Sequence, residues 1–263
     1  MSILIPLYIY PSPGAWDPLY NAAAAHRNVD FTVIVNPCSG PCKGSLPDQA
    51  YLDEVPKLRD YPNIRTLGYV ATHYADKDIE DVLAEISLYA RWPQLTEITK
   101  MRMDGIFFDE TPSTFDIDDY EYLKRASQAV RNSTSFGDRF VAHNPGLILP
   151  AVLNSKDVLH ESYLNLTDIT VVFEETFDKW LDKSVMDPLQ DHRIRKSKLA
   201  MILHGLPNLS AAVLDFVVDQ VEETADWLFL TNIAEPDEYY HSFSDMFADV
   251  VRSVDGWKRR KTR

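Results

Sequence analysis

The stretch that decides the fold is DGIFFDE, residues 104–110, an apolar run that has acids at both ends. A continuous rather than alternating run of this length is typical of a parallel strand that is covered on both faces. Asp104 begins the run, and Asp109 and Glu110 end it side by side. An acid at a strand end often caps the next helix. Two adjacent acids also suggest a site at the carboxyl end of the strand.

Seven similar runs lie at regular intervals on either side of this one. Successive runs begin 27 to 40 residues apart. A strand, a crossover helix and two loops together need roughly 30 residues, so this rhythm predicts a chain of βα units. The runs are ILIPLYIY from residue 3, FTVIVN from 31, IRTLGYV from 64, RFVAHN from 139, DITVVFE from 168, LAMILHG from 199 and DWLFLTN from 226.

The segments between the runs have helical periodicity. The clearest is DIEDVLAEISLYARW, residues 78–92, and the weakest is LILPAVLNSKDVLHESYLNL, residues 147–166. We therefore expect one (β/α)8 TIM barrel domain that spans residues 1–263. A doubly wound open sheet is the alternative. It usually carries a glycine-rich first turn, which YPSPGAW, residues 10–16, does not provide.

The charge balance indicates which partners to expect. The chain has 26 basic and 40 acidic residues and a net charge of −14. Such a surface argues against nucleic acid or an anionic membrane as the main partner. The one basic run, residues 258–263, predicts a solvated, frayed tail, with a polyanion contact as the alternative. Glu222 and Glu223, together with the acids at 116, 118 and 119, are predicted to be solvated helix positions.

No targeting or membrane segment is predicted. The apolar start, MSILIPLYIYP, lacks a basic leader and a cleavage site, so we interpret it as the first strand. No apolar stretch is long enough to span a bilayer. The compartment stays open, and we expect a monomer. The only two cysteines, Cys38 and Cys42, are expected to be ordinary loop thiols. A small disulfide loop is the alternative, and a zinc site is not expected.

Polar groups follow every predicted strand, at the end where barrels carry their catalytic residues. The acids among them are Asp109 and Glu110 at the end of the fourth run and Glu174 at the end of the sixth. Strands four and six of a barrel are separated by one strand, so these carboxylates are expected to face each other across the mouth. Opposed carboxylates are what glycoside hydrolysis requires, one protonated and one ionised. Burial and proximity would separate their pKa values and assign the two roles.

The other strand-end residues predict a sugar site. Flat aromatic rings suit the faces of sugars, and histidine and asparagine side chains can bond to hydroxyl groups. Three histidines at a barrel mouth could instead bind a metal, but we expect neither a metal nor a cofactor. The predicted substrate contacts are Tyr8, Tyr10, Asn36, Tyr69, His73, His143, Asn144, Glu175, His204 and Asn232.

Six of these stretches together resemble the spherulin-4-like family, glycoside hydrolase family 135. The resemblance extends from about residue 5 to about residue 235 and lies in register on most predicted strands. The motifs are PLYIYPSPGAWDPLY, FTVIVNPCSGP, YPNIRTLGYVATHY, DGIFFDE, HNPG and VVFEE. The resemblance implies a (β/α)8 barrel that cleaves α-1,4-linked N-acetylgalactosamine within galactosaminogalactan, a fungal exopolysaccharide.

The same resemblance assigns roles to the acids. It implies a retaining mechanism in which Glu174 is the acid/base and an acid on strand four is the nucleophile. We prefer Asp109 as the nucleophile, with Glu110 positioning substrate, and the reverse stays open. Glu175 is the residue with which Glu174 is most easily misaligned. Cys42 stands where the family usually has glycine, so a Cys38–Cys42 cross-link or an altered specificity is possible.

Two alternatives to this activity remain. One is a non-catalytic carbohydrate-binding or structural protein of a cell or spore wall, the context from which the family takes its name. The other is hydrolysis of a different glycan, because subsite loops determine which sugar is bound. The retention of all three acids favours an enzyme that acts on a hexosamine-containing polysaccharide.

Overall fold

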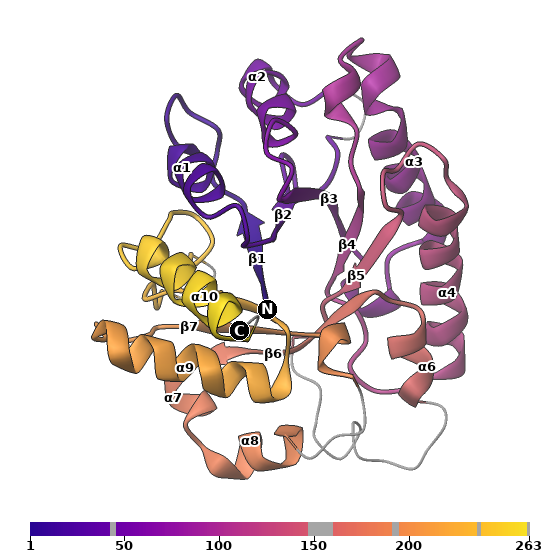
Figure 1. The fold of residues 1–263 in the computed structure, drawn as a ribbon. Helices are drawn as coiled ribbons and strands as arrows, with labels where there is room; N and C mark the ends of the chain where they lie inside the picture. The colour runs from indigo at the N-terminus through magenta and orange to yellow at the C-terminus, as the bar shows by residue number, and fades with distance from the viewer. Residues whose placement is uncertain (43–45, 147–159, 191–194, 236–237, 262–263) are drawn as a thin grey trace.

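Eight parallel strands close into a barrel in the computed structural model, which describes residues 1–42, 46–146, 160–190, 195–235 and 238–261 (Figure 1). Each strand pairs with its sequence neighbours, and β1 pairs with β8 to complete the circle. The predicted (β/α)8 barrel is confirmed. The strands are β1 (Ser2–Leu7), β2 (Phe31–Val35), β3 (Ile64–Ala71), β4 (Gly105–Asp109), β5 (Phe140–His143), β6 (Ile169–Thr176), β7 (Leu199–His204) and β8 (Trp227–Leu230).

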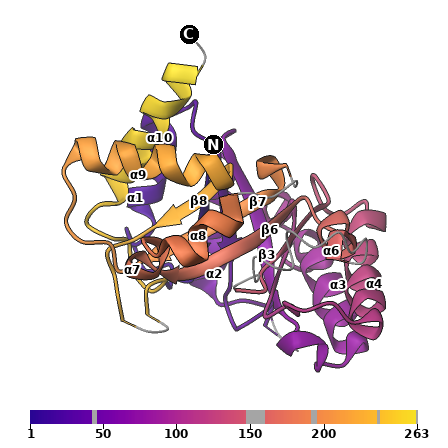
Figure 2. The same cartoon turned by 90° about the horizontal axis from the view of Figure 1, so that it is seen from below.

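Helices connect the strands and surround them, as Figures 1 and 2 show. None of the helices in the described ranges is long and apolar enough to cross a membrane. Residues 147–159 of the weakly periodic fifth connection lie outside the described residues. The helices are α1 (Asp17–Ala25), α2 (Gln49–Leu58), α3 (Ile79–Leu95), α4 (Ile117–Asn132), α6 (His160–Asn165), α7 (Phe177–Trp180), α8 (Lys183–Gln190), α9 (Ala211–Thr224) and α10 (Phe247–Lys261). Short 3-10 turns are η1 (His73–Ala75), η2 (Thr99–Met101) and η3 (Lys196–Lys198).

Two apolar layers account for the continuous runs in the sequence. Alternate strand residues such as Leu4, Ile34 and Phe107 fill the barrel interior. The residues between them, such as Ile106 and Phe108, pack outward in a larger core that includes helix residues. Successive side chains of a strand point to opposite faces, so a strand that is buried on both faces has no polar positions along its centre.

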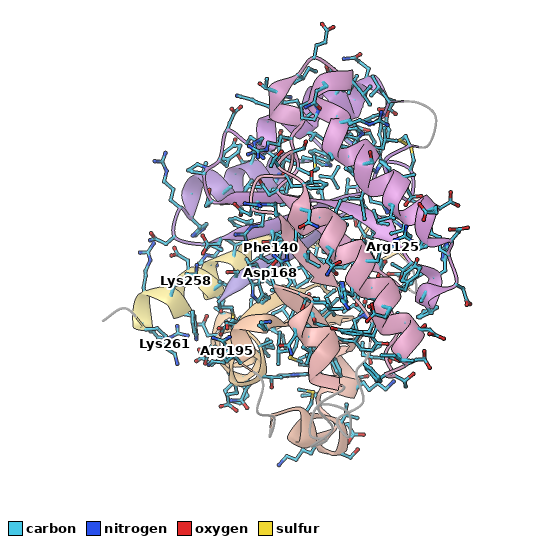
Figure 3. All side chains as sticks on the ribbon, turned by 90° about the vertical axis from the view of Figure 1, so that its right-hand side faces the viewer. Arg125, Phe140, Asp168, Arg195, Lys258 and Lys261 are labelled. Carbon is cyan, nitrogen blue, oxygen red and sulfur yellow. A yellow bond between two sulfur atoms is a disulfide. The ribbon has the colours of Figure 1, made fainter. Side chains whose placement is uncertain are left out.

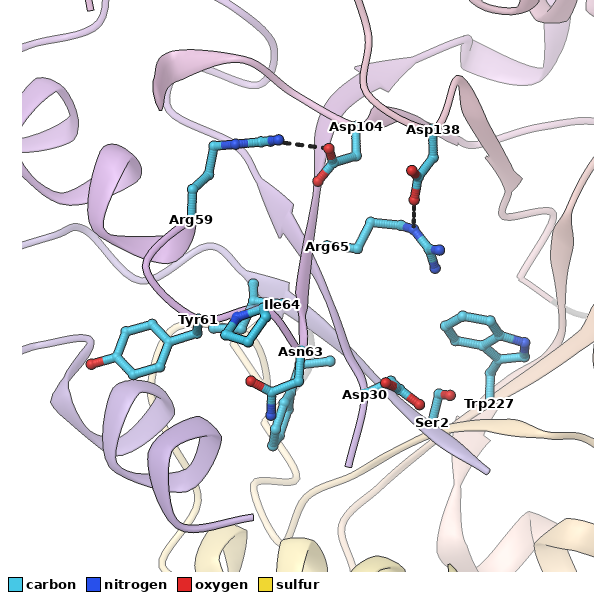
Figure 4. Close-up of a pocket in the computed structure, with 12 residues that line it drawn as sticks. Ser2, Asp30, Arg59, Tyr61, Asn63, Ile64, Arg65, Asp104, Asp138 and Trp227 are labelled. Atoms are coloured by element: carbon cyan, nitrogen blue, oxygen red, sulfur yellow. Dashed lines mark hydrogen bonds and ion pairs between the residues drawn. The ribbon is translucent and has the colours of Figure 1, made fainter. Parts of the chain in front are cut away.

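Ion pairs surround a hollow of about 510 Å³ at the amino-terminal end of the barrel (Figure 4). Asp104 is 7% exposed and accepts hydrogen bonds from the backbone N–H of Thr66 (2.9 Å) and from Nη1 of Arg59 (3.0 Å). Arg65 pairs with Asp138 (2.8 Å) beside it. The acid that begins DGIFFDE is therefore structural, because it satisfies buried donors where β3 and β4 begin.

The basic run is not a frayed tail over its described part. Residues 258–261 form the last turn of α10, on which Figure 3 labels Lys258 and Lys261. This helix packs against α9 and α1. Lys258 pairs with Asp30 (2.5 Å) and Arg260 with Asp219 (2.7 Å). The prediction was wrong because acids that are distant in sequence lie along this turn, and cations also suit a helix carboxyl end.

Two further predictions are corrected. Glu222 is 8% exposed and pairs with Lys196 and Lys261, so it is not a solvated helix position. Cys38 and Cys42 form a disulfide, not two free thiols. The turn between them places their Cα atoms 5.0 Å apart, within the range that a disulfide spans.

Candidate active site

Three consecutive strands place one polar side chain each at the carboxyl end of the barrel. Asp109 ends β4, Asn144 follows β5, and Glu174 lies near the end of β6. Nδ2 of Asn144 donates to Oδ1 of Asp109 (2.8 Å) and to Oε2 of Glu174 (2.7 Å). Because the two bonds share one nitrogen, these oxygens lie no farther apart than the sum of the bonds, 5.5 Å. The predicted opposition of the two acids is present in the structure.

The alternation of side chains along β5 explains why Asn144 lies between the two acids and why its neighbour His143 does not. Phe140 and Ala142 of β5 face the barrel interior, so Asn144 continues the same face. His143 faces outward, is 2% exposed and lies 3.2 Å from Oγ of Ser127 on α4. Burial lowers the pKa of His143 to about 3, so this ring is neutral. The structure thus places the predicted substrate contact His143 behind the barrel wall, away from the carboxylates.

A bulge in β6 decides which of two adjacent glutamates enters the barrel. Val171 faces inward, and the register against β7 shifts between Val171 and Phe173. After the shift, Glu174 pairs with Ile202, an interior position. One extra residue in a strand reverses the alternation beyond it. Glu174 therefore faces the barrel, whereas Glu175 pairs with Lys179 one helical turn away (2.6 Å).

Burial raises the pKa of both opposed carboxyl groups. The pKa of Glu174 is raised to about 7, chiefly by desolvation and further by the charge of Asp109. Desolvation also raises the pKa of Asp109, although hydrogen bonds from Tyr69, Asn144 and the backbone N–H of Glu110 favour its charged form. Glu174 is therefore suited to carry a proton near neutral pH, while the hydrogen bonds that Asp109 accepts oppose the effect of its burial and favour its ionised form.

Two tyrosines that are not among the predicted site residues complete the surroundings of Glu174. The hydroxyl groups of Tyr239 (3.0 Å) and Tyr240 both donate to its Oε1. They belong to the segment between β8 and α10, and Tyr240 also contacts the Tyr8 ring edge-to-face. The other oxygen of Glu174, Oε2, accepts a hydrogen bond from Asn144 and lies on the side of Asp109. Adjacent tyrosines soon after the eighth strand were the only sequence signal, and it was not specific.

Glu110 diverges from Asp109 at the end of β4. Its backbone is left-handed, with φ of 51°, and its carboxylate lies 2.5 Å from Nδ1 of the exposed His73. The two predicted residues therefore form a pair at the rim. Asp109, not Glu110, shares Asn144 with Glu174.

The remaining predicted contacts divide into two groups. Tyr8 and Tyr69 lie beside the carboxylates. Tyr69 forms a hydrogen bond with Asp109, and the charges of Asp109 and Glu174 help to raise the pKa of Tyr8. His204 joins them through its ring, which stacks on Tyr239 with 4.3 Å between ring centroids.

Two other predicted contacts are occupied by the protein itself. Oδ1 of Asn36 accepts from the backbone N–H of Gly40 (2.9 Å) in the disulfide loop, and Tyr10 donates to Asp48 (2.8 Å). Asn232 lies partly exposed just after β8, and the structure gives it no contact with the carboxylates. Within the described residues, no group of three or more histidine, cysteine or acidic side chains could hold a metal ion.

Comparison with known proteins identifies the family. The model of spherulation-specific family 4 matches residues 2–254. The chain belongs to spherulation-specific family 4. This confirms the resemblance that the strand-end motifs carry. A curated family member, spherulin-4 of Physarum polycephalum, is 29% identical over 176 residues, which are 66% of this chain and 45% of that protein. The match thus spans less than half of the Physarum protein.

Solved structures agree with this assignment. Aspergillus clavatus Sph3, solved in complex with GalNAc, is 36% identical with a TM-score of 0.88, and the match covers 97% of each chain. A family 18 chitinase from Pseudoalteromonas aurantia is only 11% identical, with a TM-score of 0.56 over 97% of this chain and 99% of that one. The second likeness shows the shared barrel fold alone.

Proposed function

We propose that this family 4 protein is a retaining endo-glycosidase that cleaves α-1,4-linked N-acetylgalactosamine or galactosamine in a polysaccharide such as galactosaminogalactan. The observation that carries the proposal is the bridge from one Asn144 nitrogen to both Asp109 and Glu174. Retaining enzymes place their two carboxyl groups about 5–5.5 Å apart, whereas inverting enzymes leave a wider gap of about 6.5–9.5 Å for water. The bridge keeps the nearer oxygens of the two groups within 5.5 Å of each other, which favours the retaining class over the wider inverting one.

In the proposed first step, Glu174 donates its proton to the glycosidic oxygen as that bond breaks. An Oδ of Asp109 attacks the anomeric carbon from the opposite face, which forms a covalent glycosyl-enzyme and releases the shortened polymer. The raised pKa of Glu174 supports the acid role, because a neutral carboxyl near pH 7 has a proton to give. Asp109 is preferred to Glu110 as nucleophile, because the carboxylate of Glu110 is paired with His73.

In the second step, Glu174, now ionised, removes a proton from water that attacks the same carbon. The bond to Asp109 breaks, and the product has the configuration of the substrate. Asn144 stabilises the ionised form of each carboxylate in turn, because it donates to both. The Sph3 complex with GalNAc supports the choice of an N-acetylhexosamine as the sugar.

The test measures new reducing ends and the anomeric configuration of the first product on a panel of hexosamine polymers. Wild-type protein is expected to release products with the α configuration. Glu174→Gln and Asp109→Asn should each lower the rate by at least about a thousandfold while the chain stays folded. Glu175→Gln, one residue away, is the matched control and should keep most of the activity. Binding of the polymer by wild type without new reducing ends would refute hydrolysis and favour a wall-binding protein.

A further inference from the structure

A left-handed turn of three consecutive residues stands beside the candidate active site. His73, Tyr74 and Ala75 have φ angles of 49°, 57° and 72°, and none of them is glycine. Residues with a Cβ rarely enter this region, and then normally as single residues, because the Cβ approaches the neighbouring carbonyl oxygen. Such a conformation persists only where the surrounding structure enforces it, and it is concentrated at functional sites.

Hydrogen bonds to the end of β4 enforce the turn. The backbone N–H of Tyr74 donates to the carbonyl oxygen of Glu110 (2.6 Å). The hydroxyl of Thr72, which is fully buried, shares its one proton between the carbonyl oxygens of Asp109 (3.1 Å) and Glu110 (2.8 Å). The turn is thereby fixed to the two residues that carry the strand-four acids.

A buried ion pair fixes the other side of the turn. Nζ of Lys77 donates to the carbonyl oxygen of Ala71 (3.0 Å) and to Oε2 of Glu85 on α3 (2.7 Å). Both charged side chains are largely buried, at 11% and 4% exposure. The backbone of the turn is therefore clamped between β3, β4 and α3, so the position of its central residue is predetermined.

That central residue is a tyrosine that the protein does not use internally. The side chain of Tyr74 is 62% exposed, and it makes no hydrogen bond or ring contact among the described residues. Tyr10, the other exposed rim tyrosine, differs: its hydroxyl bonds Asp48, and its ring packs edge-on against Tyr51. What distinguishes Tyr74 is the combination of an exposed ring, unpartnered within the described part of the chain, with a strained backbone that surrounding contacts hold in place beside the candidate active site.

We propose that Tyr74 forms an outer sugar-binding subsite, where its ring stacks against a hexosamine residue of the polymer beyond the one at the cleaved bond. The C–H groups on one face of a pyranose give it an apolar surface, which the flat, exposed ring of Tyr74 can cover. An endo-acting enzyme must bind sugar residues of the polymer on both sides of the bond that it cleaves. This subsite rests on the proposed function, since the backbone of Tyr74 is hydrogen-bonded to Glu110, the residue that follows the proposed nucleophile Asp109.

Two glycine variants distinguish the effect of the Tyr74 ring on binding from the effect of the backbone turn. Tyr74→Gly and Ala75→Gly each place glycine at a position with positive φ, where glycine is unstrained, so both are expected to fold. Only the first removes the ring. Binding is measured in the Glu174→Gln background with hexosamine oligosaccharides of increasing length, so that no hydrolysis intervenes. Tyr74→Phe keeps the ring and serves as the conservative variant, and Phe216→Ala on α9 removes an equally exposed aromatic residue elsewhere.

The expected result is a loss of affinity that depends on chain length. Tyr74→Gly should weaken binding of long oligosaccharides about tenfold, the upper end for one aromatic stacking contact, and leave binding of the monosaccharide unchanged. The other three variants should bind like the parent. Unchanged affinity in Tyr74→Gly would overturn the proposal. An equal loss in Ala75→Gly would also overturn it, because the turn and not the ring would then matter. Failure of hydrolysis in the wild type would be seen separately, by the reducing-end assay.

Discussion

Removal of the Glu174 carboxyl group should change how the stability of the protein depends on pH. The pKa of this group is about 7 in the folded chain, against an ordinary value of 4.5. Below pH 4.5 it is protonated in both states, so it contributes no pH-dependent difference. Between pH 4.5 and 7 the unfolded chain releases the proton and the folded chain keeps it. The wild type therefore loses stability as the pH rises through this window.

The size of the loss follows from the two pKa values. At 1.36 kcal/mol for each pH unit, a rise from 4.5 to about 7 corresponds to about 3 kcal/mol. In Glu174→Gln this titration is absent. The amide NH2 of the new glutamine faces one of the groups that now donate to Glu174, either Asn144 or a tyrosine hydroxyl. Two donors that face each other form no hydrogen bond, and this cost does not vary with pH. The quantity to compare is therefore the change in the difference between the variant and the wild type.

Urea denaturation at intervals from pH 4 to pH 8 provides the measurement. Between these limits, the free energy of unfolding of Glu174→Gln should rise relative to the wild type by about 3 kcal/mol. Glu175→Gln controls for the loss of a negative charge from the same strand end. A difference between Glu174→Gln and wild type that stays constant from pH 4 to pH 8 would refute the idea that desolvation holds Glu174 protonated near neutrality.

Three further substitutions test other parts of the structure. Tyr239→Phe removes a hydrogen bond that lowers the pKa of Glu174, so the basic limb of the kcat/KM profile should move to higher pH; an unmoved limb would contradict this. Lys77→Met removes the cation that pairs with the buried Glu85 and should lower the free energy of unfolding by about 3–5 kcal/mol in urea denaturation; a loss below about 1 kcal/mol would show that the pair is not needed. Gly105→Ala would place a methyl group 1.9 Å from a backbone oxygen of the neighbouring strand. It should lower Tm by about 6 °C or more, and a Tm within about 1 °C of wild type would contradict that close approach.

The strands could be predicted because each is buried on both faces. Continuous apolar runs at intervals of about one βα unit gave all eight, and the strand-end rule then directed attention to Asp109 and Glu174. The same alternation also distinguishes His143 from Asn144, once the inward face of β5 is known. Which face of β5 points inward is set by its pairing with β4 and β6. A run that is apolar on both faces does not reveal that orientation.

The bulge in β6 could not be predicted. DITVVFEE reads as a regular strand, in which Ile169, Val171 and Glu175 would share one face. Only the register against β7 shows that the phase reverses before Glu174. The strand-end position and the family resemblance, and not the alternation along the strand, led to Glu174 rather than Glu175.

Long-range contacts were also beyond the sequence. Tyr239 and Tyr240 reach Glu174 from a segment with no periodic pattern, and the path of such a segment is set by the elements it crosses. The basic carboxyl end looked like a free tail for the same reason. Lys258 pairs with Asp30, which is 228 positions away in the sequence, and Arg260 pairs with Asp219, which is 41 positions away.

The order of the strands explains why an asparagine lies between the two acids. Strands β4 and β6 are both neighbours of β5, so their backbones are about 10 Å apart, twice the spacing of adjacent strands. Asp109 and the longer Glu174 lean inward from either side, and the residue after β5 necessarily lies between them. Two carboxylates brought this close repel each other unless a donor separates them. An amide nitrogen carries two N–H groups and can serve both acids at once, while Oδ1 of Asn144 accepts from the backbone N–H of Gly146 (2.9 Å) and so fixes the orientation of the amide. A hydroxyl has one proton to donate, and a carboxyl in this position would add a third acid. The spacing of the two acids is thus set by one side chain on the strand between them.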